Sequence, residues 1–331
     1  MQDPQFMARH AADFVMPRRR ADLGHRLLRG SMVFLPSRTW EKLSGTLACN
    51  HRRKFYLCSS VGRLAGMKRV GRRTGLYNVN TAYVEMKRKV IIVGATSGLG
   101  RGIAETYISC GWTVGVAGRR ENLLQEVVAT AGAAPAYYAV CDVTDPVTAV
   151  PALQALVEQL GGMDLLVMSA GVGRQNPDLD YAVELPMLRT NVTGWTAIVD
   201  WAYRYFVERG GGQLAAISSI AALRGLAPAP AYSATKAFQA HYLEALRQRA
   251  LASGLPLSVT DIRPGFVDTP LLADPRQFFW VLPPDKAVRA IVRAIDRRRG
   301  VAIVTRRWRW LAPVMRVAPT WLLARILGGR R

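Results

Sequence analysis

From residue 86 onward, short apolar runs alternate with longer stretches in which apolar residues recur every three or four positions. Short apolar runs of this kind are typical of strands buried on both faces, and their alternation with helical periods is typical of βαβ units. We expect strands at 89–93, 113–117, 136–141, 165–168, 213–217, 257–262 and 301–304. The expected helices include 121–131, 147–160, 185–209, 232–252 and 285–298. The pattern predicts one doubly wound α/β domain, a Rossmann-type parallel seven-stranded sheet with helices on both faces.

The two ends of the chain depart from this pattern. Residues 1–85 hold 16 Lys and Arg against five Asp and Glu and show no sustained period, so we expect a basic, disordered extension. It is either a targeting segment or a translated upstream region, and Asp3, Asp13 and Asp22 argue against an organellar presequence. The predicted organisation is therefore an extension at 1–85, a catalytic domain at 86–305 and a tail at 306–331.

The tail mixes Trp and Leu with Arg in a way that suits an amphipathic helix. Pro313, Arg316 and Pro319 exclude a transmembrane helix there. Two interpretations stay open. The tail either lies peripherally on a membrane, or it packs over the substrate entrance or onto a neighbouring subunit.

Composition narrows the class of protein only a little. Apolar residues make up 50% of the 331 residues, enough for one large core, and the net charge is +22. Such a charge favours anionic partners, namely lipid, nucleic acid or a phosphorylated cofactor. No motif resembles a base-reading module, so no specific nucleic acid is expected. The four cysteines lack metal-ligand spacing, which indicates free thiols in a reducing, cytoplasmic compartment and no metal site.

A glycine-rich segment directly follows the first predicted strand and runs into a helix. It reads Gly94-Ala-Thr-Ser-Gly-Leu-Gly-Arg-Gly102. Glycines allow close approach of the backbone to a pyrophosphate, and the N–H groups and dipole of the helix N-terminus favour the anion. The cofactor contacts expected in this loop are Gly94, Thr96, Ser97, Gly98, Leu99 and Gly100.

The end of the second predicted strand bears on which dinucleotide binds. A carboxylate at this place would bind the ribose 2′-hydroxyl and repel a 2′-phosphate. The chain has Gly118 followed by Arg119 and Arg120 instead. A guanidinium makes bidentate, charge-assisted bonds to phosphate, so the sequence favours NADP(H) over NAD(H).

Acid–base chemistry is indicated by Tyr232 and Lys236, which are four residues apart on a predicted helix. That spacing places both side chains on one face, where a lysine ammonium can favour the ionised form of a phenol. Such a tyrosine can transfer protons near neutral pH. Ser219 lies thirteen residues before Tyr232, and Ser218 beside it is a competing candidate.

Together these motifs resemble the classical short-chain dehydrogenase/reductase family, and the resemblance covers residues 86–305. The family's glycine motif matches Gly94, Gly98 and Gly100, with Val93 where threonine is usual. Its catalytic serine, tyrosine and lysine match Ser219, Tyr232 and Lys236. The remaining matches are Asp142, Val143, Ala170, Gly171, Asn191, Pro264, Gly265, Val267 and Thr269. Met168-Ser169 replaces two asparagines of the family pattern, so their side-chain bonds are lost.

The resemblance implies hydride transfer between a nicotinamide and a carbonyl or hydroxyl carbon. Tyr232 would exchange the proton, Ser219 would bond the substrate oxygen, and Lys236 would lower the pKa of the tyrosine and bind the cofactor's ribose. Asn191 would support a water that links Lys236 to solvent. A homodimer or homotetramer is implied as well.

The apolar Phe278-Phe279-Trp280 segment indicates a hydrophobic substrate, unless these side chains only fill the core. The alternative to an enzyme is a non-catalytic NADP-binding sensor or scaffold.

Overall fold

A computed structural model describes residues 88–132, 134–272, 276 and 278–327. The predictions made for residues 1–85 lie outside this part of the chain. The described residues form one seven-stranded sheet in which every strand is parallel to its neighbours. The strands are β1 (Lys89–Val93), β2 (Thr113–Gly118), β3 (Ala136–Val140), β4 (Leu165–Met168), β5 (Gly212–Ile217), β6 (Leu257–Arg263) and β7 (Val301–Ile303). The predicted sheet is confirmed.

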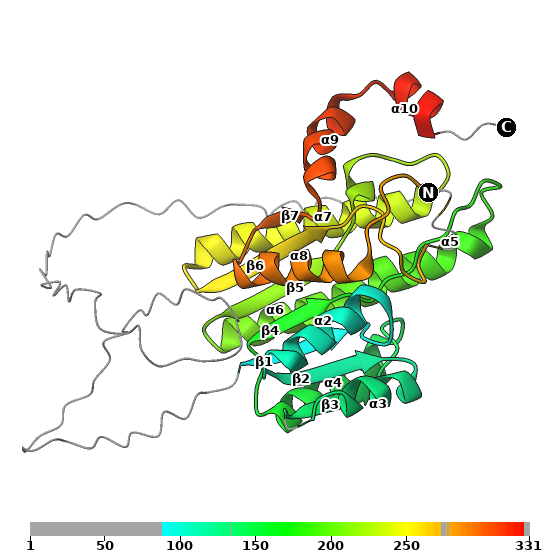
Figure 1. The fold of residues 1–331 in the computed structure, drawn as a ribbon. Coiled ribbons are helices and arrows are strands. Elements are labelled where there is room, and N and C mark those ends of the chain that lie inside the picture. Colours follow the sequence, from blue (N-terminus) through cyan, green and yellow to red (C-terminus); the bar gives the residue numbers. More distant parts are fainter. Residues whose placement is uncertain (1–87, 133, 273–275, 277, 328–331) are drawn as a thin grey trace, which may run out of the picture. The chain divides into compact units, whose positions relative to one another are not determined.

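The strand order is β3-β2-β1-β4-β5-β6-β7 (Figure 1). The chain starts at β1, runs outward to β3, and then returns to place β4 on the other side of β1. The direction of winding therefore changes between β1 and β4. In open parallel sheets, ligands bind at the carboxyl ends of the strands at such a switch point.

Helices cover both faces of the sheet. One core cluster joins the sheet to α2 (Gly98–Ser109), α3 (Glu121–Ala129) and α8 (Pro284–Asp296). The cluster on the other face contains side chains of α4 (Pro146–Leu160), α6 (Trp195–Glu208) and α7 (Pro230–Ser253). The doubly wound architecture is thereby confirmed.

Local sequence explains where several of these helices begin and end. Pro146, Pro230 and Pro284 occupy the first helical position, where the missing N–H costs nothing and the fixed φ suits a helix. Gly161 and Gly254 end α4 and α7 with φ values of 70° and 68°, the left-handed conformation that glycine adopts without a Cβ penalty.

The helix expected at 185–209 differs from prediction. It begins earlier, as α5 (Tyr181–Leu188), and a π-helical segment, η1 (Arg189–Gly194), separates α5 from α6. Gly194, at the end of η1, lets this segment pass close to the turn after β3. A Cβ atom there would lie 1.9 Å from the carbonyl oxygen of Val143. Single π-helical turns are frequent at functional sites.

The tail forms two helices after β7, α9 (Arg306–Val317) and α10 (Thr320–Leu327) (Figure 1). Trp308, Ala312 and Met315 are buried on one face of α9. Trp310 and Val317, in contrast, are 82% and 81% exposed. The tail therefore packs on the protein with one face and leaves a second apolar face open. No helix in the described part of the chain has the length and apolar character needed to cross a bilayer.

Candidate functional site

The predicted site residues follow the carboxyl ends of the strands. Gly94 follows β1, Arg119 follows β2, Asp142 follows β3 and Ala170 follows β4. Ser219 comes two residues after β5, and Pro264 follows β6 directly. Since all strands are parallel, these residues share one edge of the sheet, with the switch point between β1 and β4 among them.

In the glycine loop, residues 94–100, two glycines lie so close to neighbouring backbone that a side chain would not fit at either position. Gly94 has φ 89°, and a Cβ atom there would lie 2.5 Å from the amide nitrogen of Ala170. A Cβ atom at Gly100 would lie 2.1 Å from the carbonyl oxygen of Gly94. At Gly98 it would lie 3.4 Å from Thr269, so this loop adjoins the segment after β6. Glycine at these positions thus allows the tight turn from β1 into the N-terminus of α2.

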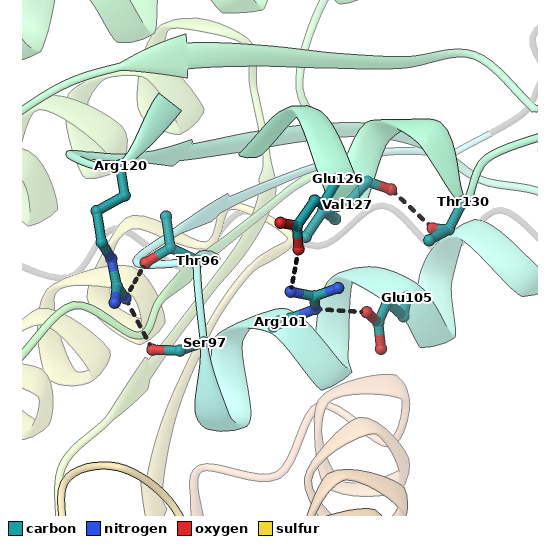
Figure 2. A network of polar contacts seen from close by, with 8 residues as sticks. All are labelled: Thr96, Ser97, Arg101, Glu105, Arg120, Glu126, Val127 and Thr130. Atoms are coloured by element: carbon teal, nitrogen blue, oxygen red, sulfur yellow. Dashed lines mark hydrogen bonds and ion pairs between the residues drawn. The ribbon is translucent and has the colours of Figure 1, made fainter. Parts of the chain in front are cut away.

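Arg120 extends from the end of β2 over the glycine loop (Figure 2). Its Nη2 donates to the hydroxyl oxygens of Thr96 and Ser97 at 2.6 and 3.0 Å. Arg119 points elsewhere, with its Nη1 3.8 Å from the carboxylate of Asp142. Arg101 is already paired with Glu105 and Glu126. Of these three arginines, Arg120 is the one held on neutral hydroxyls of the loop.

Three other predicted cofactor contacts have clear structural surroundings. The Asp142 carboxylate accepts bonds from the N–H and hydroxyl of Thr144, which fixes the turn after β3. Val143 packs into the core beneath α6 and α4, and Leu99 packs against the opposite core cluster. Val143 and Leu99 therefore offer their backbone, rather than their side chains, to this edge.

The acid–base cluster is defined as Ser219, Tyr232 and Lys236. Tyr232 and Lys236 lie in the first two turns of α7, with the Lys236 Nζ 5.8 Å from the centre of the Tyr232 ring. The hydroxyl of Ser219 hydrogen-bonds the Tyr232 phenol. Ser219 also caps the short helix η2 (Ile220–Leu223). The neighbouring Ser218 is buried and donates to Asp261, so the geometry favours Ser219 of the two candidates.

Burial controls the protonation of this cluster. It raises the pKa of the Tyr232 phenol, and the hydrogen bond with Ser219 opposes this effect. Burial lowers the pKa of Lys236 to about 8, although the charge of Asp261 acts in the opposite direction. From the sequence we expected the lysine to lower the pKa of the tyrosine. Burial acts in the opposite direction, so the pKa of the Tyr232 phenol is higher than that of a free tyrosine.

Asn191 is fully buried at the centre of η1 and uses its whole side chain on its neighbours. Its amide bonds both the N–H and the carbonyl of Val172, at 2.9 and 2.7 Å, and also the Thr235 hydroxyl. These bonds fasten the loop after β4 to α7. Its backbone carbonyl accepts a hydrogen bond from the side chain of Gln239.

Sequence reasoning missed two residues of this site. A Cβ atom at Gly173 would lie 2.7 Å from the Tyr232 ring, so this glycine lets the loop cover the ring. Gln239 accepts a 2.9 Å hydrogen bond from the Lys236 Nζ. Its signal was present in the sequence, because Gln239 lies one helical turn after Lys236 on the face of α7 that is buried.

The segment after β6 is covered by the tail. A Cβ atom at Gly265 would lie 2.0 Å from the indole nitrogen of Trp308. The Trp308 ring also contacts the rings of Phe266, Phe279 and Trp280, with centroids 5.5–5.7 Å apart. Phe279 and Trp280 remain 47% and 44% exposed, so they do not simply fill the core.

Comparisons with known proteins agree with this geometry. The family model described as short chain dehydrogenase matches residues 88–278. An oxidoreductase of Myxococcus xanthus is 40% identical over 56% of this chain and 74% of the relative. Sulfoacetaldehyde reductase 2 of Chromohalobacter salexigens is 31% identical, over 54% of this chain and 73% of that protein.

Solved structures show the same fold at low identity. The 3-ketoacyl-(acyl-carrier-protein) reductase of Brucella melitensis, complexed with NADH, aligns with a TM-score of 0.59 and 24% identity. Its alignment covers 65% of this chain and 95% of that one. Levodione reductase aligns equally well, with a TM-score of 0.59 and 22% identity over 66% of this chain and 95% of its own. The chain belongs to the short-chain dehydrogenase family of oxidoreductases.

Proposed function

We propose that this protein is an NADP(H)-dependent carbonyl reductase whose substrate is a hydrophobic small molecule. The observation that carries the proposal is the placement of Ser219 beside the Tyr232 phenol, with the Lys236 Nζ 5.8 Å from the centre of the Tyr232 ring. A phenol that is protonated at neutral pH can give its proton to a carbonyl oxygen, and a nearby ammonium stabilises the tyrosinate that is left. The relatives named sulfoacetaldehyde, 3-ketoacyl and levodione reductase all reduce a carbonyl group by name.

The glycine loop fits a dinucleotide. Side chains at Gly94 or Gly100 would collide with neighbouring backbone, so the glycines let the chain turn tightly into the N-terminus of α2, where backbone N–H groups suit a pyrophosphate. Residues of the loops after β3, β4 and β6 complete the proposed cofactor contacts. These are Asp142, Val143, Ala170, Gly171, Pro264, Gly265, Val267 and Thr269, in addition to the loop residues and Arg119 and Arg120.

The preference for NADP(H) rests on the end of β2. Gly118 leaves no carboxylate there, and a Cβ atom at this position would already lie 3.0 Å from the Thr96 methyl group. Arg120 is held by Thr96 and Ser97, and its guanidinium forms no ion pair with a carboxylate in the part of the chain that the structure describes. A 2′-phosphate would supply that charge.

The roles of the protein's own residues follow from their positions. When bound, the cofactor supplies the hydride. Tyr232 gives its phenolic proton to the carbonyl oxygen, and Ser219 bonds the same oxygen as charge develops on it. The Lys236 ammonium stabilises the tyrosinate that remains. Asn191 holds the loop after β4 and the backbone beside Lys236 in place.

Fluorescence titration with NADPH and NADH tests the cofactor. We expect Arg119→Ala and Arg120→Ala each to weaken NADPH by about tenfold or more, because a hydrogen bond to a charged group contributes about 1.5–3 kcal/mol. NADH affinity should stay within about twofold. Arg204→Ala, an exposed arginine on α6, is the matched control. Equal losses for both nucleotides would contradict the preference, and tight NADPH binding without turnover of any carbonyl would favour a sensor.

The exposed face of the tail favours a second function, contact with an anionic membrane surface. Trp310, Val314 and Val317 are spaced to share one face of α9 and are 57–82% exposed, and Trp321 of α10 is 68% exposed. The chain has no Asp or Glu after Asp296, whereas Arg306, Arg307, Arg309 and Arg316 are exposed around this face. Apolar side chains ringed by arginine suit the headgroup region of an anionic bilayer. The cytoplasmic location proposed from the sequence allows such contact.

Cosedimentation with vesicles tests this contact. We expect the full chain to bind phosphatidylglycerol-containing vesicles, and the double variant Trp310→Asp with Val317→Asp to lose at least about tenfold in affinity. The double variant Val147→Asp with Leu251→Asp removes two comparably exposed apolar side chains elsewhere and should bind as wild type. Equal binding by both double variants would assign any membrane affinity to other parts of the chain.

Pairing into a homodimer or homotetramer through α6 and α7 remains part of the proposal. Light scattering on the eluting protein measures the mass directly. A mass equal to that of a monomer at micromolar concentration would contradict the predicted oligomer and leave the catalytic proposal intact.

A further inference from the structure

Gln239 is fully buried in α7, one helical turn beyond Lys236. A buried carboxamide is costly unless its donors and its acceptor find partners. Both ends of this one do. The Oε1 accepts from the Lys236 Nζ at 2.9 Å, and the Nε2 donates to the backbone carbonyl of Asn191 at 2.8 Å. The carboxamide therefore bridges the lysine and the π-helical turn η1.

The rest of the lysine's surroundings explain why this bridge matters. The Lys236 Nζ makes one other hydrogen bond, to the Ile217 carbonyl at the end of β5, at 3.1 Å. Without Gln239, the Nζ would lose one of its two hydrogen bonds in the described structure. The carbonyl of Asn191 would lose the side-chain partner that now reaches it.

We propose that Gln239 is a positioning residue whose carboxamide holds the Lys236 ammonium and the η1 backbone at a fixed spacing. This rests on the proposed function of the acid–base cluster. A carboxamide accepts at its oxygen and donates at its nitrogen, so its two bonds have fixed directions. The oxygen faces the lysine, which favours the charged ammonium.

The charged and titratable groups around Lys236 define which substitutions are informative. Tyr232 faces it from α7, and Asp261 of β6 acts on its charge. Asp261 is itself bound to Arg263 and Ser218. Gln239 carries no charge and is given no part in the proton transfer. It can therefore be substituted without removing any of these groups. Gln239→Leu removes both bonds at similar volume, whereas Gln239→Glu keeps the acceptor, adds a negative charge and loses the donor.

The first measurement needs no cofactor. Lysines labelled with ¹³C at Cε are titrated by NMR, and the Lys236 signal is identified by its loss in Lys236→Met. We expect the midpoint of Lys236 to fall by about one pH unit in Gln239→Leu, because a hydrogen bond to the charged form is lost. It should rise by a similar amount in Gln239→Glu, because a carboxylate favours the ammonium.

The second measurement is the pH profile of carbonyl reduction by the same proteins. The alkaline limb should move to lower pH in Gln239→Leu and to higher pH in Gln239→Glu. In Gln239→Leu, kcat should fall about tenfold while the KM of the carbonyl substrate stays within about twofold. A residue that only supports the fold would lower the amount of active protein without moving the limb.

Gln213 supplies the matched control. It is a second buried glutamine, on β5, and its Nε2 donates to the carbonyl of Ile295 in the last turn of α8, whereas Lys236 and Tyr232 lie on α7. Gln213→Leu should lower Tm as much as Gln239→Leu does, yet leave both the Lys236 titration and the pH profile unchanged. This separates a positioning role from loss of a buried hydrogen bond.

The outcomes distinguish this proposal from the proposed function. If wild type reduces carbonyls but neither Gln239 variant moves the Lys236 midpoint, or Gln213→Leu moves it equally, the positioning role is overturned. If the midpoints move as expected but wild type turns over no carbonyl, the bridge stands and the reductase assignment fails.

Discussion

The glycine loop at residues 94–100 and the acid–base cluster lie along the same edge of one sheet, but they are built from different parts of the chain. At the loop, backbone passes so close to backbone that a Cβ atom at Gly100 would lie 2.1 Å from a carbonyl oxygen. At the cluster, buried side chains from η1 and α7 bond one another, and Asn191 and Gln239 have no exposed surface. The first region depends on glycines where backbone passes close to backbone, and the second depends on buried side chains that bond one another.

This difference determines what each region tolerates. A backbone cradle is damaged by any added atom, because the neighbouring backbone cannot move aside. A buried polar network is damaged by any unmatched donor or acceptor, because an unpartnered buried group loses its solvation without compensation. Substitutions in the two regions should therefore produce different losses, one in nucleotide binding and the other in turnover.

The largest effect is expected from Tyr232→Phe, which removes the proton donor and keeps the ring that Gly173 covers. Turnover should fall by about 10²–10⁴-fold, the usual contribution of general acid catalysis, while NADPH affinity stays within about twofold. Steady-state kinetics and fluorescence titration measure the two quantities. Tyr242→Phe on the same helix, which loses a bond to Asp200, should retain turnover. A Tyr232→Phe variant as active as wild type would contradict the mechanism.

The next effect is expected from Gly100→Ala, which attacks the backbone cradle. The added methyl group would collide with the Gly94 carbonyl, so we expect a loss of about 1–3 kcal/mol in the free energy of unfolding and at least tenfold weaker NADPH binding. Urea denaturation and titration report these changes. Gly225→Ala, where a Cβ atom would meet nothing within 4 Å, should change neither. Unaltered binding in Gly100→Ala would show that the loop is not the nucleotide cradle.

The smallest effect is the pH dependence of the acid–base cluster. Burial lowers the pKa of Lys236 from 10.5 to about 8, so the ammonium is present below that pH and is lost above it. For carbonyl reduction, kcat/KM should be level below about pH 8 and decline above it. Between about pH 8 and 10.5, Lys236 is protonated in the unfolded chain but has lost its proton in the native protein. The contribution of Lys236 to the free energy of unfolding therefore becomes more favourable as the pH rises through this range. A flat profile to pH 10 would separate Lys236 from the chemistry.

The two regions also differ in how far the sequence predicts them. The seven strands and the glycine loop follow from apolar runs and glycine spacing, since both depend on local backbone demands. The roles proposed for Tyr232, Lys236 and Ser219 were predicted from spacing as well. The spacing of Gln239 from Lys236 was visible too, but its bond to η1 was not, because that partner lies 48 residues away and only the fold brings the two together.

Other features that the sequence did not predict also depend on contacts between residues far apart in the chain. The π-helical turn at Arg189–Gly194 depends on the passage of Gly194 beside Val143, which no helical period reveals. Arg119 and Arg120 could not be separated by sequence, since the direction of each guanidinium is set by Asp142 in one case and by Thr96 in the other. The sequence left the tail with two interpretations because α9 has two apolar faces. One face is buried against the protein and the other is exposed.

Transfer of deuterium from C4-deuterated NADPH to a hydrophobic ketone, followed by mass spectrometry, tests the central claim most directly. The account predicts that wild type forms an alcohol with deuterium on the former carbonyl carbon, and that Tyr232→Phe binds the cofactor but forms almost none. A wild-type protein that binds NADPH tightly and transfers deuterium to no aldehyde or ketone in a broad panel would contradict it.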